Sequence, residues 1–227
     1  MYKRQDKARI LAGFFKTGKG EYGEGDVFLG ITVPLQRGVA KRFKEIKLDQ
    51  LSVLLKNPIH ECRLTALEIL VMQYEDAVKG EDVVNFYLKN TRHINNWDLV
   101  DLSAQYILGD WLLNCGPKAK PDRKILYKLV KSKNIWERRI AIISTFAFIR
   151  AGKFEDTFKL AKILMRDEHD LIHKAVGWML REVGKRDEKV LVKFLNEHAV
   201  QMPRTMLRYA IEKFSLEKRK KYLNMKS

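Results

Sequence analysis

The sequence has few of the residues that stabilise disulfide-bonded or metal-bound folds. Cys62 and Cys115 are the only cysteines among 227 residues, and they lie far apart in ordinary helical sequence. They do not form a pair with zinc-site spacing, and no Ser or Cys lies in a recognisable nucleophile motif. We therefore expect two reduced thiols in a cytoplasmic protein that uses neither a metal nor a cofactor.

Long apolar runs are also absent. No segment approaches the roughly 18 uncharged apolar residues of a transmembrane helix. The first residues, "MYKRQDKARI", are charged and have no apolar run behind them, which argues against a secretory signal. The sequence therefore predicts no membrane partner.

Proline and glycine are scarce, and helical periodicity dominates. The five prolines and thirteen glycines lie at the ends of periodic segments. There is no hairpin signal and no alternating strand, and 46% of the residues are hydrophobic, so we predict a folded, all-α protein. The predicted helices are 3–16, 34–45, 48–56, 59–76, 80–89, 95–114, 121–132, 134–151, 153–166, 169–185, 187–198, 202–214 and 216–224.

Four of these helices form an internal repeat. The aligned segments are "HECRLTALEIL" from His60, "DLVDLSAQYIL" from Asp98, "WERRIAIISTF" from Trp136 and "IHKAVGWMLRE" from Ile172. Successive offsets are 38, 38 and 36 residues, somewhat short of the roughly 40–47 residues of HEAT-like helix pairs. Such units must stack to bury their apolar faces, so we expect one HEAT-like α-solenoid domain over residues 1–227.

The alignment predicts a cluster of functional side chains. Its fourth position is Arg63, Asp101, Arg139 and Ala175 in successive repeats. Equivalent positions of stacked helices lie about 8–10 Å apart, which would make Asp101 and Arg139 neighbours. Trp97 lies one turn before Asp101, and Trp178 about one turn after the equivalent Ala175. Two indoles, a carboxylate and a guanidinium would then share one surface.

Simpler roles exist for each of these residues. Trp97 and Trp178 could pack in the interior, as we expect for Trp111 and Trp136. Asp101 could form only a structural salt bridge with its neighbour on the next repeat. The combination of the four side chains favours a functional cluster.

Two other motifs are better explained without a ligand. "GKGEYGEG", residues 18–25, contains G-x-G-x-x-G, but no strand precedes it, and Glu21, Glu24 and Asp26 would repel a phosphate. We interpret it as a flexible connecting loop from which Tyr22 is a candidate to reach over a binding surface.

His169 and His173 have helical i, i+4 spacing. The segment lacks the glutamate that follows the first histidine of a zinc protease helix. The surrounding acidic residues favour the start of a helix over a metal site.

Positive charge is the strongest compositional signal. The chain has 44 Lys and Arg against 28 Asp and Glu, a formal net charge of +16. This balance favours a polyanionic partner such as DNA, RNA or an anionic membrane surface, although a highly soluble protein without such a partner is the simpler reading. Basic residues recur along the chain, as in "KRFKEIK", "WERRIA" and "EKRKKY", which fits an extended basic surface.

These residues resemble the AlkD-like family of DNA alkylation repair glycosylases, which are HEAT-like α-solenoids. The likeness covers nearly the whole chain. It rests on "FLGITVP" at 28–34, "NNWDLVD" at 95–101, "NIWERRIAI" at 134–142 and "HKAVGWMLREVGKRD" at 173–187.

The resemblance implies roles for particular residues. It implies that Asp101 is the catalytic carboxylate, that Trp97 and Trp178 are the cleft tryptophans and that Arg139 contacts DNA. A further aromatic of some members corresponds to Tyr22 only with a one-residue gap. The helical region before "FLGITVP" is short for the family.

Excision of an alkylated purine can be catalysed by a single carboxylate without a second, acidic group. Breaking an N-glycosidic bond gives the sugar oxocarbenium character, and a purine alkylated at N3 or N7 is already a cationic leaving group that needs no acid. Asp101 would stabilise the sugar cation, and the two indoles would attract the cationic nucleotide.

The predicted function is therefore excision of N3- or N7-alkylated purines from double-stranded DNA by a monofunctional, monomeric glycosylase. The expected partner is duplex DNA containing alkylated bases, with no obligate protein partner, so DNA binding would associate this cytoplasmic protein with the nucleoid. Further candidates for DNA contacts are Lys174, Arg181, Arg204 and Arg208. The alternatives are a non-catalytic HEAT-like module that binds damaged or branched DNA, and a scaffold that binds an acidic protein.

Overall fold

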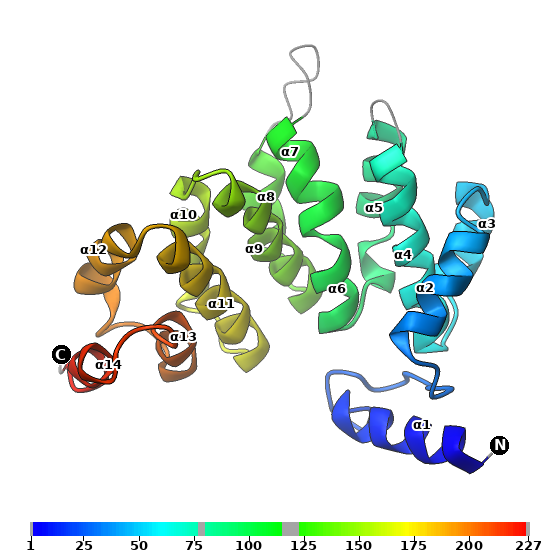
Figure 1. The fold of residues 1–227 in the computed structure, drawn as a ribbon, viewed down its shortest axis with the longest axis horizontal. Coiled ribbons are helices and arrows are strands. Elements are labelled where there is room, and N and C mark those ends of the chain that lie inside the picture. The colour runs from blue at the N-terminus through cyan, green and yellow to red at the C-terminus, as the bar shows by residue number, and fades with distance from the viewer. Residues whose placement is uncertain (1, 77–79, 115–122, 226–227) are drawn as a thin grey trace. The chain divides into compact units, whose positions relative to one another are not determined.

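The computed structural model describes residues 2–76, 80–114 and 123–225. Every regular element in these ranges is helical, apart from an isolated bridge between Val27 and Ile59, and the all-α prediction is confirmed (Figure 1). No helix in these ranges is long and apolar enough to cross a membrane. Cys115 lies outside the described residues.

The chain divides into two compact units, unit 1 at Met1–Ile107 and unit 2 at Leu108–Ser227. Each unit is described by itself. The prediction of one continuous solenoid domain over 1–227 stays a prediction.

Unit 1 is built around one long helix. Its helices are α1 (Tyr2–Phe14), α2 (Val33–Arg42), α3 (Leu48–Leu55), α4 (His60–Asp76), α5 (Glu81–Lys89), the 3₁₀ turn η1 (Thr91–His93) and α6 (Trp97–Ser103). α4 packs against α2, α3, α5 and α6 (Figure 1). Fully buried apolar residues from all five helices form the core, among them Ala40, Leu51, Leu67, Leu70, Tyr87 and Leu99.

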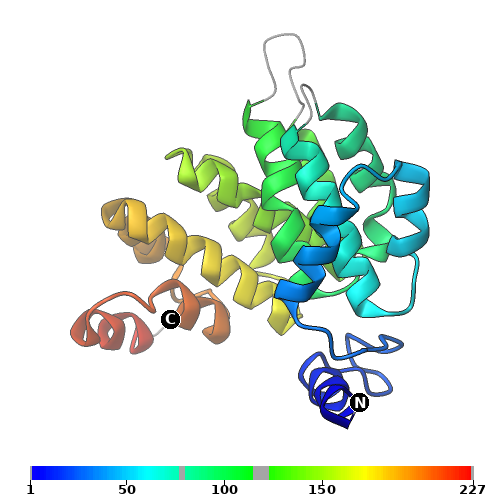
Figure 2. The same cartoon turned by 45° about the vertical axis from the view of Figure 1, so that its right-hand side comes forward.

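Unit 2 has two long helices at its centre. Its helices are α7 (Asp110–Asn114), α8 (Lys124–Leu129), α9 (Ile135–Arg150), α10 (Glu155–Leu164), α11 (Asp170–Arg186), α12 (Glu188–His198), α13 (Arg204–Ala210) and α14 (Leu216–Leu223). α9 contacts α11, and α11 lies beside α13 (Figure 2). Within each unit, equivalent helices of the predicted repeat therefore pack side by side: α4 with α6, and α9 with α11.

Asparagine residues begin two of the repeat helices. The side chain of Asn96 accepts a hydrogen bond from the Trp97 backbone N–H at 2.8 Å, and Asn134 accepts one from Trp136 N–H at 2.9 Å. Such caps satisfy backbone donors that the first turn leaves without a helical partner. The Asn residues of "NNWDLVD" and "NIWERRIAI" thus fix where α6 and α9 begin.

The predicted helix 95–114 is observed from Trp97 to Asn114, but a π-helical turn interrupts its α-helical pattern. α6 ends at Ser103, a π-helical turn η2 follows at Gln105–Gly109, and α7 then begins. The side-chain amide of Gln105 donates to the Asp101 carbonyl oxygen at 3.0 Å, and Ser103 Oγ donates to the Leu99 carbonyl oxygen at 2.6 Å. Such side-chain bonds compete with the regular backbone ladder, and Ser144 makes one within the uninterrupted helix α9.

Candidate functional site

Trp97 and Asp101 lie on α6, four residues apart. Both side chains are half-buried, and the helical backbone puts them on one face, as the spacing predicts. Asp101 is close enough to α5 for its charge to act on Tyr87. Burial, and secondarily the Asp101 carboxylate, raise the pKa of the Tyr87 hydroxyl above its usual range, against the lowering effect of its hydrogen bond with Ser103.

The Trp97 ring belongs to an aromatic stack within unit 1. Phe15 stacks on Trp97 with ring centroids 5.2 Å apart and planes 16° apart, and Phe28 stacks on Phe15 at 5.0 Å. His60 lies against both phenyl rings, at 4.6 Å from Phe28 and 4.9 Å from Phe15. Phe14 contacts the indole edgewise at 5.9 Å. Trp97 is therefore oriented by residues at the end of α1.

A buried charge cluster lies beside the stack. Asp26 receives three hydrogen bonds: from His60 Nδ1 at 2.9 Å, from Asn96 Nδ2 at 3.1 Å and from Arg63 at 2.5 Å. The other ring nitrogen of His60 lies 2.8 Å from Asp98 Oδ2. His60 and Asp98 are the aligned first positions of two successive repeats, so this contact ties α4 to α6 in the predicted register.

The cluster stabilises the charged forms of its members. Burial lowers the pKa of His60, but hydrogen bonds to Asp26 and Asp98 and the charges of these carboxylates outweigh burial and raise the pKa to about 9. Burial raises the pKa of Asp26, but the His60 hydrogen bond, the Arg63 charge and the Asn96 hydrogen bond together lower it below its ordinary value. Both shifts indicate an imidazolium between carboxylates.

The glycine-rich segment 18–25 leads into Asp26. The carboxylate of Glu21 accepts the Gly18 N–H at 2.9 Å, and that of Glu24 accepts the Gly20 N–H at 2.8 Å. The loop's own carboxylates thus occupy the backbone N–H groups that a phosphate would need. Tyr22 donates from its hydroxyl to the Phe14 carbonyl oxygen at 3.5 Å, next to the residue that contacts Trp97; its role above a binding surface stays a prediction.

Glu61 fixes the segment "FLGITVP". Its buried carboxylate accepts the backbone N–H groups of Leu29 at 3.0 Å, Gly30 at 2.8 Å and Ile31 at 3.2 Å. Gly30 has a φ of 78°, and a Cβ there would lie 2.4 Å from the Arg4 carbonyl oxygen. Only glycine allows α1 to approach this closely.

A cavity of about 300 Å³ opens beside the same residues in unit 1. Its walls are mostly apolar. They include Lys7, Phe15, Phe28, Gln36, His60 and Asp98.

In unit 2, Trp178 lies half-buried in the middle of α11. Its ring contacts Phe146 of α9 at 5.8 Å and 60°. The guanidinium groups of Arg150 and Arg186 lie over the same phenyl ring, at 5.0 and 5.7 Å. Two guanidinium groups therefore lie over the phenyl ring that contacts the Trp178 indole.

Arg139 of α9 is buried and donates from one guanidinium nitrogen to the Leu171 carbonyl oxygen at 2.7 Å. It thereby connects α9 to the first turn of α11, a structural contact that the sequence did not indicate. Trp97 and Asp101 belong to unit 1, and Arg139 and Trp178 to unit 2. Their predicted convergence on one surface stays a prediction.

The other predicted DNA contacts differ in how far they are engaged within unit 2. Lys174 pairs with Asp170 at 2.7 Å, and Arg181 pairs with Glu212. Arg204 donates to the Leu223 carbonyl oxygen at 2.8 Å.

Arg208 of α13 is exposed, and its side chain has no ion pair or hydrogen bond within the described part of the chain. A phosphate contact by Arg208 would therefore break no internal interaction. Of the four candidates, it is the one most available to a phosphate.

"HKAVGWMLREVGKRD" contains a packing site as well as Trp178. A Cβ at Gly177 would lie 2.5 Å from both the Met206 carbonyl oxygen and the Tyr209 Cβ. The glycine lets α11 and α13 pack in close contact. Part of this motif is thus explained by the fold of unit 2.

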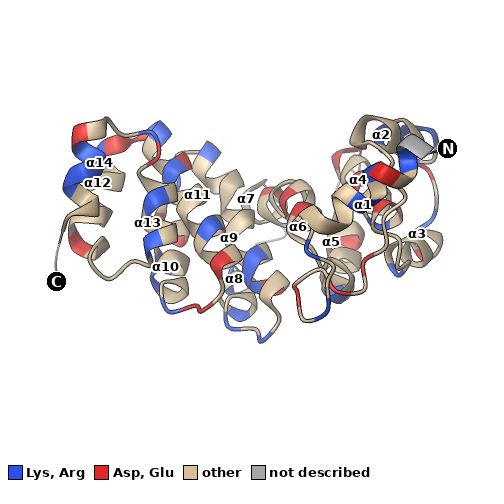
Figure 3. Ribbon diagram, turned by 90° about the horizontal axis from the view of Figure 1, so that it is seen from below, with Lys and Arg blue, Asp and Glu red and all other residues tan. Residues whose placement is uncertain are grey.

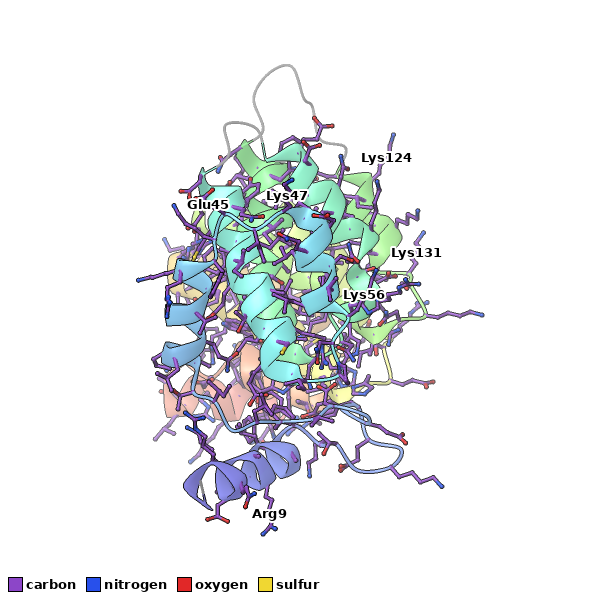
Figure 4. All side chains as sticks on the ribbon, turned by 90° about the vertical axis from the view of Figure 1, so that its right-hand side faces the viewer. Arg9, Glu45, Lys47, Lys56, Lys124 and Lys131 are labelled. Atoms are coloured by element: carbon purple, nitrogen blue, oxygen red, sulfur yellow. The ribbon has the colours of Figure 1, made fainter. Side chains whose placement is uncertain are left out.

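Net charge is divided unequally between the units. Residues 1–107 contain 16 Lys and Arg against 14 Asp and Glu, a net charge of +2, whereas residues 108–227 contain 28 against 14, a net charge of +14. Basic residues lie on the helices of unit 2 from α8 to α14 (Figure 3). In unit 1, Arg9 points outward from α1 (Figure 4).

His169 and His173 lie at the start of α11, as the sequence predicts. His169 is the N-cap of α11 and accepts the Leu171 N–H at 3.2 Å, and His173 Nε2 contacts the Asp167 carbonyl oxygen at 2.5 Å. No group of His, Cys, Asp and Glu in the described residues could hold a metal ion. Cys62 is a half-buried free thiol, and burial raises its pKa.

Comparison with known proteins gives one consistent result. The model of a family described as "DNA alkylation repair enzyme" matches residues 2–214. A search of curated proteins finds no match.

Two solved structures share the fold. A "Predicted DNA alkylation repair enzyme" from Enterococcus faecalis has a TM-score of 0.73 at 18% identity, covering 93% of this chain and 96% of that chain. AlkD2 from Streptococcus mutans has a TM-score of 0.58 at 15% identity, covering 93% and 98%. At these identities the likeness establishes the fold.

Proposed function

This chain belongs to the DNA alkylation repair enzyme family, and from that premise we propose that it is a DNA glycosylase that removes N3- or N7-alkylated purines from duplex DNA. Family membership supports a role in alkylation repair with DNA as the partner. The observation that most favours the glycosylase is Asp101, one helical turn after an indole whose orientation is fixed by stacking on Phe15.

In the proposed reaction the bond between the sugar C1′ and the purine nitrogen breaks, and its electron pair neutralises the cationic purine. The Asp101 carboxylate stabilises the sugar cation and accepts a proton from the water that attacks C1′. At an effective dielectric of about 20, a charge pair about 4 Å apart contributes roughly 4 kcal/mol. Because about 1.36 kcal/mol is a factor of ten in rate, the carboxylate can supply about 10³-fold.

Trp97 has the complementary role of recognising the cation. An indole face attracts a cation by about 0.5–2 kcal/mol. One face of Trp97 is covered by Phe15, and the side chain is still half-exposed. The role of Trp178, in unit 2, as a second cation-binding indole stays a prediction. Normal bases are neutral, so this attraction favours alkylated purines.

Unit 2 is the proposed source of affinity. Its net charge of +14 suits contacts with phosphates, which are the same in every sequence and therefore suit a search for scattered lesions. Arg208 is the first candidate for such a contact, with Arg139, Lys174, Arg181 and Arg204 as the others. The proposed enzyme acts as a monomer on duplex DNA in the cytoplasm. Besides DNA, its reaction consumes only water.

Release of free alkylpurine from methylated duplex DNA tests the proposal. We expect the native protein to release base and Asp101→Asn to do so about 10³-fold more slowly, with unchanged DNA affinity. Asp82→Asn, at an exposed carboxylate on α5 of the same unit, is the matched control and should keep full activity.

Other outcomes would change the assignment. If the native protein binds DNA but releases no base above the spontaneous rate, the chain is a DNA-binding module without glycosylase activity. If Asp101→Asn releases base as fast as the native protein, the activity belongs to other residues.

A further inference from the structure

His60 has two hydrogen-bonding partners of the same charge. Nδ1 lies 2.9 Å from Asp26 and Nε2 lies 2.8 Å from Asp98. A neutral imidazole has a single N–H, so both contacts are hydrogen bonds only when both nitrogens are protonated. The proposed chemistry does not use this imidazolium, which is 2% exposed.

The cluster around His60 holds the backbone on both sides of Trp97. Asp98, the residue after Trp97, bonds directly to His60. Asn96, the residue before it, donates to Asp26 and accepts the Trp97 N–H at 2.8 Å. The start of α6 is therefore attached to α4 through the carboxylates that hold His60.

His60 also supports the Trp97 ring. The imidazole lies 4.9 Å from Phe15, and Phe15 stacks on Trp97 at 5.2 Å. Trp97 is thus connected to His60 through its backbone and through its side chain. Asp101 lies one turn further along the same short helix.

We infer that His60 is a positioning residue: its two N–H groups fix the start of α6, and its ring supports Phe15, so that Trp97 and Asp101 keep the placement that base release needs. Loss of one ring proton removes one hydrogen bond and leaves a buried carboxylate facing a nitrogen lone pair. The effect on turnover rests on the proposed function. The effect on Trp97 does not.

Several charged groups surround the imidazole. Asp26 comes from the loop before α2, Arg63 and Glu61 from α4, and Asp98 from α6. Lys7 of α1 lines the same cavity as His60. The Glu61 carboxylate accepts backbone N–H groups and Arg63 bonds to Asp26, so Lys7 is the charged neighbour chosen for a control substitution.

The experiment follows the ¹⁹F NMR resonance of Trp97 in the full chain labelled with 5-fluorotryptophan, with Trp97→Phe to identify the signal. We expect the Trp97 resonance to shift with a midpoint near pH 9, the pKa of His60. In His60→Gln the resonance should be displaced and this titration should disappear. His93→Gln, a half-exposed histidine of the same unit, and Lys7→Gln should each keep it.

Base release gives a second readout. A misplacement of about 1 Å in a site can cost roughly 10²-fold in rate, so we expect His60→Gln to lower the rate constant of release by about that factor while DNA affinity stays the same. His93→Gln should match the native rate. If the native protein releases no base, the glycosylase proposal fails, and the Trp97 resonance still tests the positioning by His60.

A second variant covers the case in which His60→Gln does not fold. Asp98→Asn keeps the shape of the side chain and removes one of the two charges that favour the imidazolium. The midpoint of the Trp97 titration should then move to lower pH. The inference would be overturned if the Trp97 resonance had the same chemical shift in His60→Gln as in the native protein, or if the midpoint of its titration were unchanged in Asp98→Asn.

Discussion

The two units differ in what they contribute to a DNA-processing protein. Unit 1 is nearly neutral, with a net charge of +2, and contains Asp101, Trp97 and the buried cluster that holds the start of α6. Unit 2 has a net charge of +14 and contains the predicted arginine and lysine contacts. Under the proposed function, unit 1 places the reacting carboxylate and unit 2 supplies most of the attraction for the polyanion.

The largest effect is expected from breaking the buried ion pair of unit 1. Arg63→Met removes a guanidinium that bonds Asp26 at 2.5 Å and leaves that carboxylate short of a partner. Removing one partner of a buried pair costs about 3–5 kcal/mol, measured as the free energy of unfolding in urea. Lys159→Met removes an exposed pair with Glu155 in unit 2 and should cause no measurable loss. Equal losses in the two variants would show that the buried pair of unit 1 contributes no more than an exposed one.

The pH dependence of stability should come next in size. The pKa of His60 is raised from 6.5 in the unfolded chain to about 9 in the folded protein. Its contribution, about 3 kcal/mol, is complete below pH 6.5 and is lost as the pH rises through about 9. The pKa of Asp26 is lowered, so its contribution is present above its ordinary pKa of 3.8 and is lost as the pH falls further. Urea unfolding of the native protein and His60→Gln at several pH values measures the first contribution as the difference between the two profiles; parallel profiles would refute it.

A glycine substitution tests the close packing of unit 2. Gly177→Ala places a Cβ 2.5 Å from the Met206 carbonyl oxygen and forces α11 from α13, at a cost of about 1–3 kcal/mol. Gly38→Ala lies within α2 of unit 1, where nothing approaches within 4 Å, and should stabilise by roughly 0.5–1 kcal/mol. Thermal unfolding of both variants should show shifts of opposite sign. A stable Gly177→Ala would mean that α11 and α13 adjust freely.

The smallest expected effect is on the salt dependence of DNA affinity, and it tests which of the two units contacts DNA. Arg208→Gln should reduce the slope of log affinity against log salt by about one, as expected for one lost phosphate contact. Arg9→Gln, at an exposed arginine of α1, should leave the slope nearly unchanged. Fluorescence anisotropy with a short duplex at several salt concentrations measures both. A larger change in Arg9→Gln would assign DNA contacts to unit 1 instead.

Helix positions were predictable because they depend on local patterns. The predicted 59–76, 134–151 and 169–185 correspond to α4, α9 and α11 within a residue or so at each end, and the capping residues Asn134 and His169 mark the starts of α9 and α11. The π-helical turn η2 between α6 and α7 has no such local mark. Ser103 bonds to a helix carbonyl just before it, but Ser144 makes the same kind of bond within the uninterrupted helix α9.

In the candidate site, too, the features that depend on local spacing were predictable, and those that depend on contacts between distant residues were not. Trp97 and Asp101 stand out because their spacing is local. The cluster of Asp26, His60 and Asp98 joins residues 34 and 38 positions apart. The 34-residue separation has no sequence signature, whereas the 38-residue separation is the offset of the repeat. The repeat alignment did pair His60 with Asp98, and opposite charges at equivalent positions were the signal that could have revealed their contact.

The contacts of Gly30 and Glu61 predict which mutations a genetic screen would recover. Neither residue has a part in the proposed chemistry, yet together they attach α1, whose end supplies the ring beneath Trp97. A screen of random variants for sensitivity to alkylating agents would be expected to recover both positions along with Asp101. Loss-of-function mutations at "FLGITVP" would then report how the first helix is anchored rather than where DNA binds.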